Sequence, residues 1–257
     1  MKKISFLQSS LALAVIASLV FSCQKTADRP AAINGSQGDA SVTAINDSAT
    51  LTTGESALLH GLGLPNGYNI DFRTINYNNF ECFAANSWTY SGIQAPIRSL
   101  LKFGFTGLNP ACTPATLVSA KLYLYQYVNA SNGVPYSIAH VPNDFEIRRV
   151  LTPWVSSTVT FNTSPNTAGL PSAAGAKNAV AVPAIATPFN GLQDIQVVDV
   201  TEMVKKMLAN GAPYSLNNGF MIRFPNGRET QAYKARFFGS FTAPNIADRP
   251  VLKLYWQ

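Results

Sequence analysis

The residues from Ala120 to Val128 read Ala-Lys-Leu-Tyr-Leu-Tyr-Gln-Tyr-Val, and this stretch decides the fold class. Leucine alternates with tyrosine in it, and residues two positions apart lie on the same face of a β-strand. Asn132-Gly133 follows, a dipeptide that is typical of tight turns between antiparallel strands. The stretch therefore predicts a strand followed by a turn.

Short alternating segments recur along the rest of the chain. In residues 97–105, Leu101 and Phe103 share one face of the predicted strand, and Arg98 and Lys102 share the other. Further strands are predicted at 136–142, 145–150, 158–161, 194–199, 219–224, 231–240 and 250–256. We expect 219–224 and 231–240 to pair as a hairpin, and 162–190 to wrap the core or add one edge strand.

One helix is expected after residue 200. Thr201 is its predicted N-cap, and Asn210-Gly211 is predicted to end it. The apolar stripe of this helix consists of Met203, Val204, Met207 and Leu208. About ten short strands with a single helix predict an all-β protein, built as one antiparallel β-sandwich over residues 54–257.

The N-terminus carries an export signal. Met1-Lys2-Lys3 precedes an apolar run over residues 11–21, which is too short to span a bilayer and is flanked as secretory signals are. The run ends in Leu19-Val20-Phe21-Ser22-Cys23, which resembles the bacterial lipobox. Residues 1–22 are thus predicted to be a lipoprotein signal peptide and Cys23 the lipidated N-terminus. Ordinary signal cleavage, with Cys23 as a chance thiol, is the alternative.

The predicted lipid anchor places the protein in a bacterial cell envelope, on the outer membrane. Residues 23–53 are rich in Ala, Ser, Thr, Asn and Gly and contain few large apolar residues, so we expect a lipidated flexible tether. No later apolar stretch approaches the ~20 residues needed to cross a bilayer. The acyl chains are therefore the expected contact with the membrane.

Composition excludes several classes of function. Charged residues make up 12% of the chain. Removal of residues 1–22 takes away Lys2 and Lys3 and no acidic residue, so 19 basic residues become 17 against 13 acidic ones and the net charge falls from +6 to +4. This mild excess is not the clustered positive surface of a nucleic-acid binder. With two histidines and no paired cysteine motif, a zinc site is not expected.

Six segments of the chain resemble segments of the DNRLRE-type secreted domain and follow one another in the same order. This domain is a jelly-roll sandwich grouped with carbohydrate-binding module family 96. Phe161 stands where that family has a second tryptophan, and Gly104 stands where it has an aspartate. The matching segments are Arg98–Phe103, Val118–Tyr125, Trp154 with Ser157–Asn162, Asp199–Val204, Asn218–Phe220 and Arg249–Leu252. The resemblance implies a single antiparallel β-sandwich of jelly-roll type with one short helix. It also implies a noncatalytic module, which in some relatives binds acidic polysaccharides.

Two groups of residues are candidates for ligand binding. An aromatic-rich loop is expected over residues 77–90, in which Trp88 and Tyr90 are predicted to contact sugar rings; the alternative is that its aromatic residues are core. Arg223, Lys234 and Arg236 fall on the face opposite the apolar residues if the 219–240 hairpin alternates regularly. Guanidinium groups bind carboxylates through two hydrogen bonds, which suits a polysaccharide of uronic acids. The alternative is a solvated sheet face with scattered cations.

Two further sites concern covalent and metal bonds. Cys82 and Cys112 are an even pair in an oxidising compartment, so a disulfide between them is predicted over two thiols. No cofactor is expected, although a structural calcium ion is compatible with the loop carboxylates, and no residue is singled out as a ligand. The available carboxylates are Asp71, Asp144, Asp194 and Asp199.

The sequence therefore predicts a noncatalytic cell-envelope lipoprotein that binds polysaccharide through a β-sandwich module. A structural or adhesive surface subunit without a soluble glycan ligand is the alternative. No nucleophile motif accompanies His60 or His140, so an enzyme is not expected.

Overall fold

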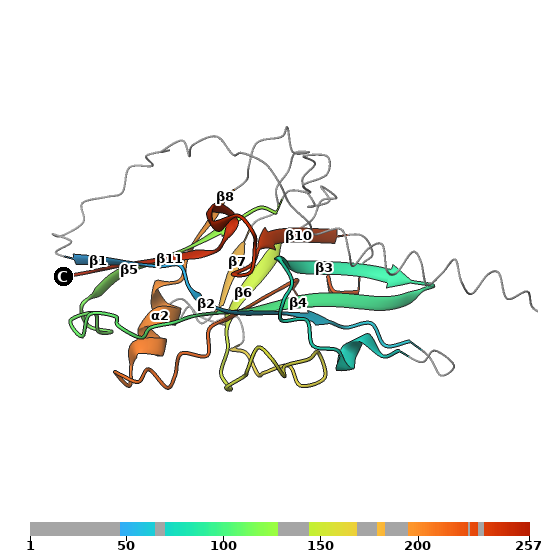
Figure 1. The fold of residues 1–257 in the computed structure, drawn as a ribbon, viewed down its shortest axis with the longest axis horizontal. Helices are drawn as coiled ribbons and strands as arrows, with labels where there is room; N and C mark the ends of the chain where they lie inside the picture. The colour runs from blue at the N-terminus through green and yellow to red at the C-terminus, as the bar shows by residue number, and fades with distance from the viewer. Residues whose placement is uncertain are drawn as a thin grey trace, which may run out of the picture.

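The computed structural model describes residues 47–64, 70–127, 144–168, 179–182, 195–225, 227–230 and 234–257. The predicted all-β antiparallel sandwich with one short helix is confirmed (Figure 1). None of the helices in these ranges is long and apolar enough to cross a membrane. The strands are β1 (Asp47–Leu51), β2 (Gly54–His60), β3 (Cys82–Tyr90), β4 (Ile93–Phe103), β5 (Leu117–Tyr125), β6 (Phe145–Arg149), β7 (Ala179–Val182), β8 (Ile195–Asp199), β9 (Phe220–Arg223), β10 (Lys234–Gly239) and β11 (Val251–Trp256). The helix is α2 (Thr201–Leu208), and short 3-10 helices occupy Phe72–Thr74 and Ile246–Asp248.

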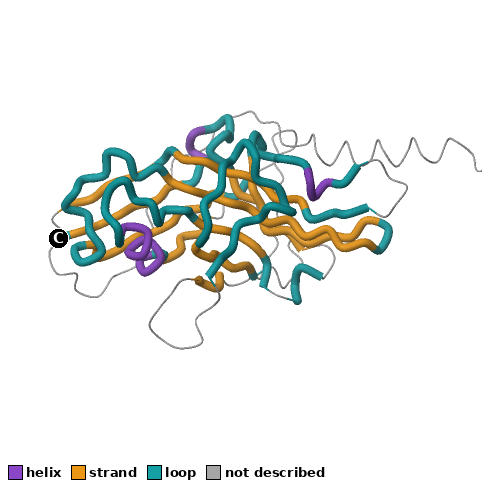
Figure 2. Tube along the Cα trace, turned by 90° about the horizontal axis from the view of Figure 1, so that it is seen from below, coloured by secondary structure: helices purple, strands orange, loops and turns teal. Residues whose placement is uncertain are grey.

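The strands form two antiparallel sheets. Sheet A has the order β1-β11-β5-β8, and sheet B has the order β10-β3-β4-β9-β6-β7, with β2 also paired to β4. The hairpin of β3 and β4 extends away from α2 and from the sheet A end of the molecule (Figures 1 and 2). Just after β5, the amide of Tyr127 donates to the carbonyl of Phe237 (3.1 Å), so the two sheets meet at this corner.

The core lies between the inner faces of the two sheets. Alternate residues of each strand reach it, as the pleat of a β-strand requires: Leu122 and Leu124 come from β5, and Leu101 and Phe103 come from β4. Helix α2 closes one end of the core with the predicted stripe of Met203, Val204, Met207 and Leu208, each at most 1% exposed. The alternation read from the sequence is thus confirmed for these segments.

The N-terminus of α2 differs from the prediction. Thr201 is the first helical residue and Val200 occupies the N-cap position without a side-chain hydrogen bond. The carboxylate of Asp199 accepts hydrogen bonds from the amide of Thr201 (2.9 Å) and from its hydroxyl (2.7 Å). A carboxylate at this end also compensates the positive end of the helix dipole.

Several predicted elements are wrong. Residues 158–161 form no strand, and β9 and β10 are not a hairpin, because β3 and β4 lie between them in sheet B. The predicted tether extends too far: residues 47–51 are β1, which pairs with β11. The expected loop at 77–90 contains β3 over residues 82–90. The predicted strand at 136–142 lies outside the described residues, as do the signal peptide and Cys23.

The predicted disulfide is also corrected, because Cys82 and Cys112 are both buried thiols that are not bonded to each other. Cys112 packs in the core between the sheets. Cys82 alternates along β3 with the core residue Phe83, so its side chain points to the other face of sheet B, beside Tyr77 and Phe80. The thickness of the sheet therefore separates the two thiols.

Candidate functional site

The predicted basic face does not form, and Arg236 is the clearest reason. Its side chain is 1% exposed and lies in the core, on the same face of β10 as Phe238. The guanidinium carbon is 5.2 Å from the ring centre of Phe145 and 5.6 Å from that of Phe238. One amino group donates to the side-chain carbonyl of Gln196, on β8 of the facing sheet (3.0 Å). Arg236 thus contacts both sheets and is not available to a ligand.

Arg223 does lie on the outer face of sheet B, as predicted, but it is occupied there. It is 8% exposed and shares the carboxylate of Glu229 with Arg98, at N–O distances of 3.0 and 2.8 Å. Burial lowers the pKa of its guanidinium, and the carboxylate of Glu229 opposes this effect. Arg98 is therefore also engaged in an ion pair within the protein.

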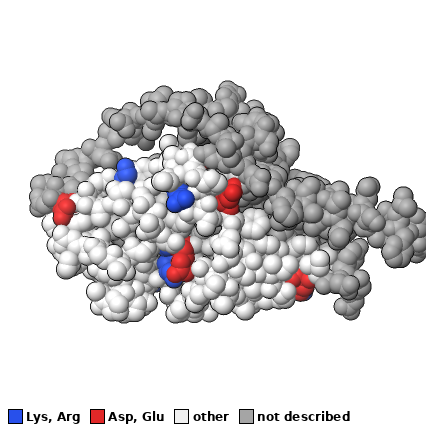
Figure 3. All heavy atoms as spheres, viewed as in Figure 1, with Lys and Arg blue, Asp and Glu red and all other residues white. Residues whose placement is uncertain are grey.

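The remaining cations are also dispersed. Residues 151–168 cover the outer face of sheet B, where Lys102 lies 5.1 Å above the ring of Trp154 and Arg98 lies 5.0 Å above that of Phe161. Lys121 belongs to sheet A, on the opposite side of the sandwich. Charged groups on the face drawn in Figure 3 are few and scattered. Lys234 lies in β10 opposite Ser87, but its side chain is outside the described part of the structure.

Trp88 and Tyr90 lie on β3 within an aromatic cluster, which we define as His60, Phe72, Tyr77, Trp88 and Tyr90. Trp88 meets His60 edge-on with ring centres 6.0 Å apart, and Tyr90 meets Trp88 in the same way at 6.4 Å. Burial lowers the pKa of His60 to about 4 and raises that of Tyr77 to about 12. Trp88 and Tyr90 are half-buried in this cluster.

Trp154, by contrast, is a core residue. It is 7% exposed, and its indole N–H donates to the carbonyl of Asn218 (2.8 Å).

A second group of aromatic residues lies on the outer face of sheet A. Tyr123 and Tyr125 alternate with the core residues Leu122 and Leu124, so they point outward from β5. On β11, Tyr255 and Lys253 point outward in the same way, beside Lys121 of β5. We call Lys121, Tyr123, Tyr125, Lys253 and Tyr255 the tyrosine face.

The side chains of the tyrosine face lie close to one another. The ammonium of Lys253 is 4.9 Å from the ring centre of Tyr123. The pKa of Tyr123 is raised by burial and then by the nearby hydroxyls of Tyr255 and Tyr125, with Lys121 opposing the shift. Within the described part of the chain, no cluster of buried hydrophobic residues forms over this face, unlike the outer face of sheet B.

This arrangement suits an extended ligand with both apolar and polar edges. Aromatic rings offer apolar, slightly negative faces to C–H groups, while their hydroxyls and the lysines donate hydrogen bonds. Lys121 is paired with Asp199 (3.2 Å), whereas Lys253 has no carboxylate partner in the described ranges. The tyrosine face was missed by the sequence analysis, although the Leu–Tyr alternation at 120–128 already carried its signal.

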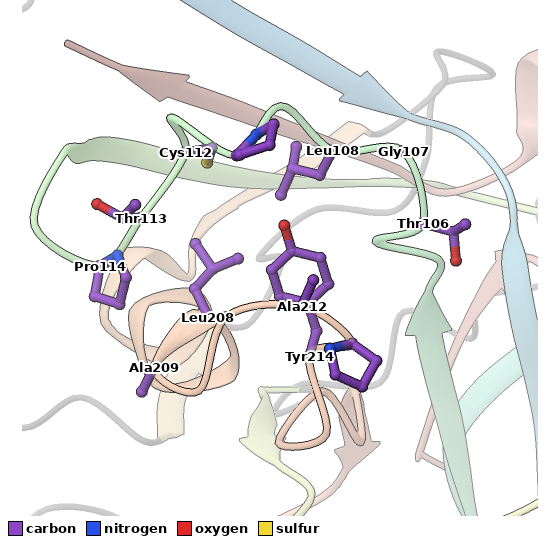
Figure 4. A pocket seen from close by; sticks show the side chains of 13 residues that line it. Thr106, Gly107, Leu108, Cys112, Thr113, Pro114, Leu208, Ala209, Ala212 and Tyr214 are labelled. Carbon is purple, nitrogen blue, oxygen red and sulfur yellow. The ribbon is translucent and has the colours of Figure 1, made fainter.

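A hollow lies elsewhere, at the end of the sandwich (Figure 4). It has a volume of about 630 Å³ and lies between the loop after β4 and the end of α2. Leu108, Leu208 and Tyr214 form its inner wall, and Cys112 lines it as well.

No metal centre forms among the described residues: no three His, Cys, Asp or Glu side chains gather as ligands. Asp71 pairs with Arg73 (2.8 Å), Asp144 with Arg228 (3.4 Å) and Asp199 with Lys121, while Asp194 lies outside the described residues. The described aspartates are thus separate from one another.

Neither a family model nor a curated protein matches this chain. The resemblance to the DNRLRE-type domain therefore stays a prediction, based on the six segments quoted above.

Proposed function

We propose that this protein is a noncatalytic, lipid-anchored module of the bacterial cell envelope, and that it binds a polysaccharide chain on the tyrosine face. The observation that carries this proposal is the grouping of Tyr123, Tyr125 and Tyr255 on the outer face of sheet A. A sheet face is nearly flat and supports side chains at regular spacing, so successive sugar rings of an extended chain find successive aromatic partners.

The charges of the face favour an acidic polysaccharide. Lys253 holds its ammonium over Tyr123, beside the site at which a sugar ring stacks, and it has no carboxylate partner in the described ranges. A carboxylate on the sugar then pairs with this ammonium while the ring packs on tyrosine. The proposed site differs from the predicted one, because Arg223 and Arg236 are buried. The proposal keeps only the predicted acidic character of the polysaccharide.

Affinity electrophoresis of the whole chain, purified in mild detergent, through gels containing a polyuronate or a neutral glucan tests the proposal. Tyr123→Ala removes a stacking face and should weaken retardation by the polyuronate about three- to tenfold, whereas Tyr123→Phe keeps the ring and should retain it. Lys253→Ala should reduce the salt dependence of binding, because exposed charge pairs are screened over a Debye length of about 8–10 Å. Unchanged mobility of Tyr123→Ala would reject the face.

Trp88→Ala is the matched control for the aromatic cluster. If Trp88→Ala abolishes retardation and Tyr123→Ala does not, the ligand binds at the cluster on β3 instead.

The anchor is tested separately through Cys23. Cys23→Ala should release the protein from the membrane fraction and prevent lipoprotein-type processing, because the acyl chains are its predicted attachment. A Cys23→Ala protein that still sediments with membranes and is cut at the same position contradicts the anchor.

A surface subunit without a glycan ligand is the second candidate, and one observation favours it. Ile195 and Val197 of β8 are 37% and 48% exposed and lie beside Tyr125 and Tyr123 on the same face. Exposed aliphatic groups next to aromatic rings are common at protein–protein interfaces. Loss of self-association or of partner binding in Val197→Ser, with no glycan bound by the wild type, would support this second function.

A further inference from the structure

The pocket at the end of the sandwich, which we call the end pocket, has no role in the function proposed above. Its residues come from two segments that the fold brings together, and none of them belongs to the tyrosine face. They are Thr106, Gly107, Leu108, Pro110, Cys112, Thr113 and Pro114 on one side, and Leu208, Ala209, Gly211, Ala212, Pro213 and Tyr214 on the other.

None of these thirteen residues is an acid or a base of the kind that carries charge at neutral pH. The thiol of Cys112 is held neutral, because burial, and then the nearby carboxylate of Asp47, raises its pKa to about 11. Charged ligands lose hydration on entering such a pocket and gain no ion pair in return. The end pocket thus selects for a neutral ligand.

The polar group best placed for a ligand is the hydroxyl of Tyr214. The ring of Tyr214 stands between Leu208 and the loop that carries Leu108, with its hydroxyl directed toward that loop (Figure 4). The hydroxyl makes no hydrogen bond within the described part of the chain. A ligand that has a hydroxyl group can form a hydrogen bond with the hydroxyl of Tyr214, whereas a hydrocarbon leaves this hydroxyl without a partner.

The backbone holds Tyr214 in place at an energetic cost. Its φ is +57°, a conformation that bulky residues rarely adopt. Its amide donates to the carbonyl of Gly211 (2.6 Å), and its ring packs edge-on against Phe105 with centres 5.6 Å apart. Strain of this kind is common where a side chain is fixed for binding.

From these observations we propose that the end pocket binds a neutral pyranose sugar. The ring of Tyr214 packs against the apolar face of the sugar beside Leu108 and Leu208, and its hydroxyl bonds to a hydroxyl of the sugar. The volume of about 630 Å³ falls in the range of small-molecule sites and accommodates about one or two sugar rings.

Ligand-observed NMR of the whole chain in mild detergent tests the proposal, with methyl glycosides of glucose, galactose and mannose as probes. Glucuronate is the charged control, and cyclohexanol is the apolar control with a single hydroxyl. At least one neutral glycoside should bind more tightly than both controls.

Tyr214→Phe keeps the ring and its contact with Phe105, and should weaken the binding of that glycoside about five- to tenfold through loss of one hydrogen bond. Ala212→Trp, at an exposed position on the wall, should abolish binding.

Tyr123→Ala should leave glycoside binding at its wild-type level, so failure of the tyrosine face and failure of the end pocket are distinguishable. The proposal is overturned if no neutral glycoside binds, or if cyclohexanol binds as tightly as the best glycoside.

Discussion

His60 links the stability of the sandwich to pH. The ring lies in the aromatic cluster with Phe72, Tyr77 and Trp88, at centre distances of 5.2, 6.0 and 6.0 Å. Its Nδ1 atom accepts a hydrogen bond from the amide of Leu62 (3.2 Å). Protonation turns this acceptor into a donor facing another donor, and it places a charge among apolar rings. The neutral form is therefore the one that fits the fold.

Burial lowers the pKa of His60 from 6.5 to about 4, so the unfolded chain binds more protons than the folded one between these values. The free energy of unfolding then rises with pH in this window and falls as the protein is acidified. Between pH 7 and pH 5 the expected loss is about 2 kcal/mol, which lowers a urea midpoint by about 1 M at a typical slope. The lowered pKa values of Asp71 and Asp199 act only at more acidic pH, because their unfolded value is 3.8.

Urea titrations at pH 7, 6 and 5, followed by tryptophan fluorescence, measure this loss. His140 is the second histidine of the chain, so all proteins should carry His140→Asn, which leaves His60 as the one histidine. His60→Asn keeps an acceptor near the amide of Leu62 but cannot titrate. It should be less stable at pH 7, because it lacks the ring, and nearly independent of pH down to 5.

Two results would refute this reasoning. A protein that contains His60 and loses less than about 0.5 kcal/mol between pH 7 and pH 5 has a histidine with an ordinary pKa. An equal loss in His60→Asn would assign the pH dependence to another group.

Three further outcomes follow from packing and burial. Gly219 has φ +74° and a Cβ there would lie 2.2 Å from the carbonyl of Leu101, so Gly219→Ala should destabilise by about 3 kcal/mol or more in urea titrations. Gly92→Ala, with φ +81° and open space around the Cβ, should cost only about 1 kcal/mol, and equal costs would contradict the steric argument. Arg236→Ala should lower the free energy of unfolding by about 2–4 kcal/mol while leaving polysaccharide affinity of the folded protein unchanged, and a selective loss of affinity would restore the basic face. Thiol labelling of the denatured, unreduced Cys23→Ala chain should modify both Cys82 and Cys112, whereas no labelling before reduction would restore the disulfide.

Local pattern was sufficient for much of the fold. Alternation placed Leu101 and Phe103 on one face and Arg98 and Lys102 on the other, and the structure keeps this division. The stripe of α2 was visible for the same reason, since a helix with one apolar side has a single way to face the core. These features depend on residues only a few positions apart.

The candidate site was harder to predict, because it depends on which strands become neighbours. Arg236 and Phe237 alternate in β10, and both faces of this strand are packed: Phe238 reaches the main core, and Phe237 joins a smaller cluster with Leu58 and Ala84. The alternation of residues along β10 therefore could not predict which of its two faces packs against the main core. The expected hairpin of β9 and β10 failed because β3 and β4, from much earlier in the chain, pair between them.

By itself the sequence determined the all-β class and the inward or outward parity of strands with one apolar face, because these follow from composition and from contacts local in the chain. Only the tertiary structure decided that Tyr123 and Tyr255 share the outer face of sheet A, that Arg223 and Arg98 share Glu229, and that Cys82 and Cys112 lie on opposite sides of a sheet. The physical reason is that sheet order and the covering of each outer face are set by pairings between distant segments. Their energies come from burial that no single segment can achieve alone.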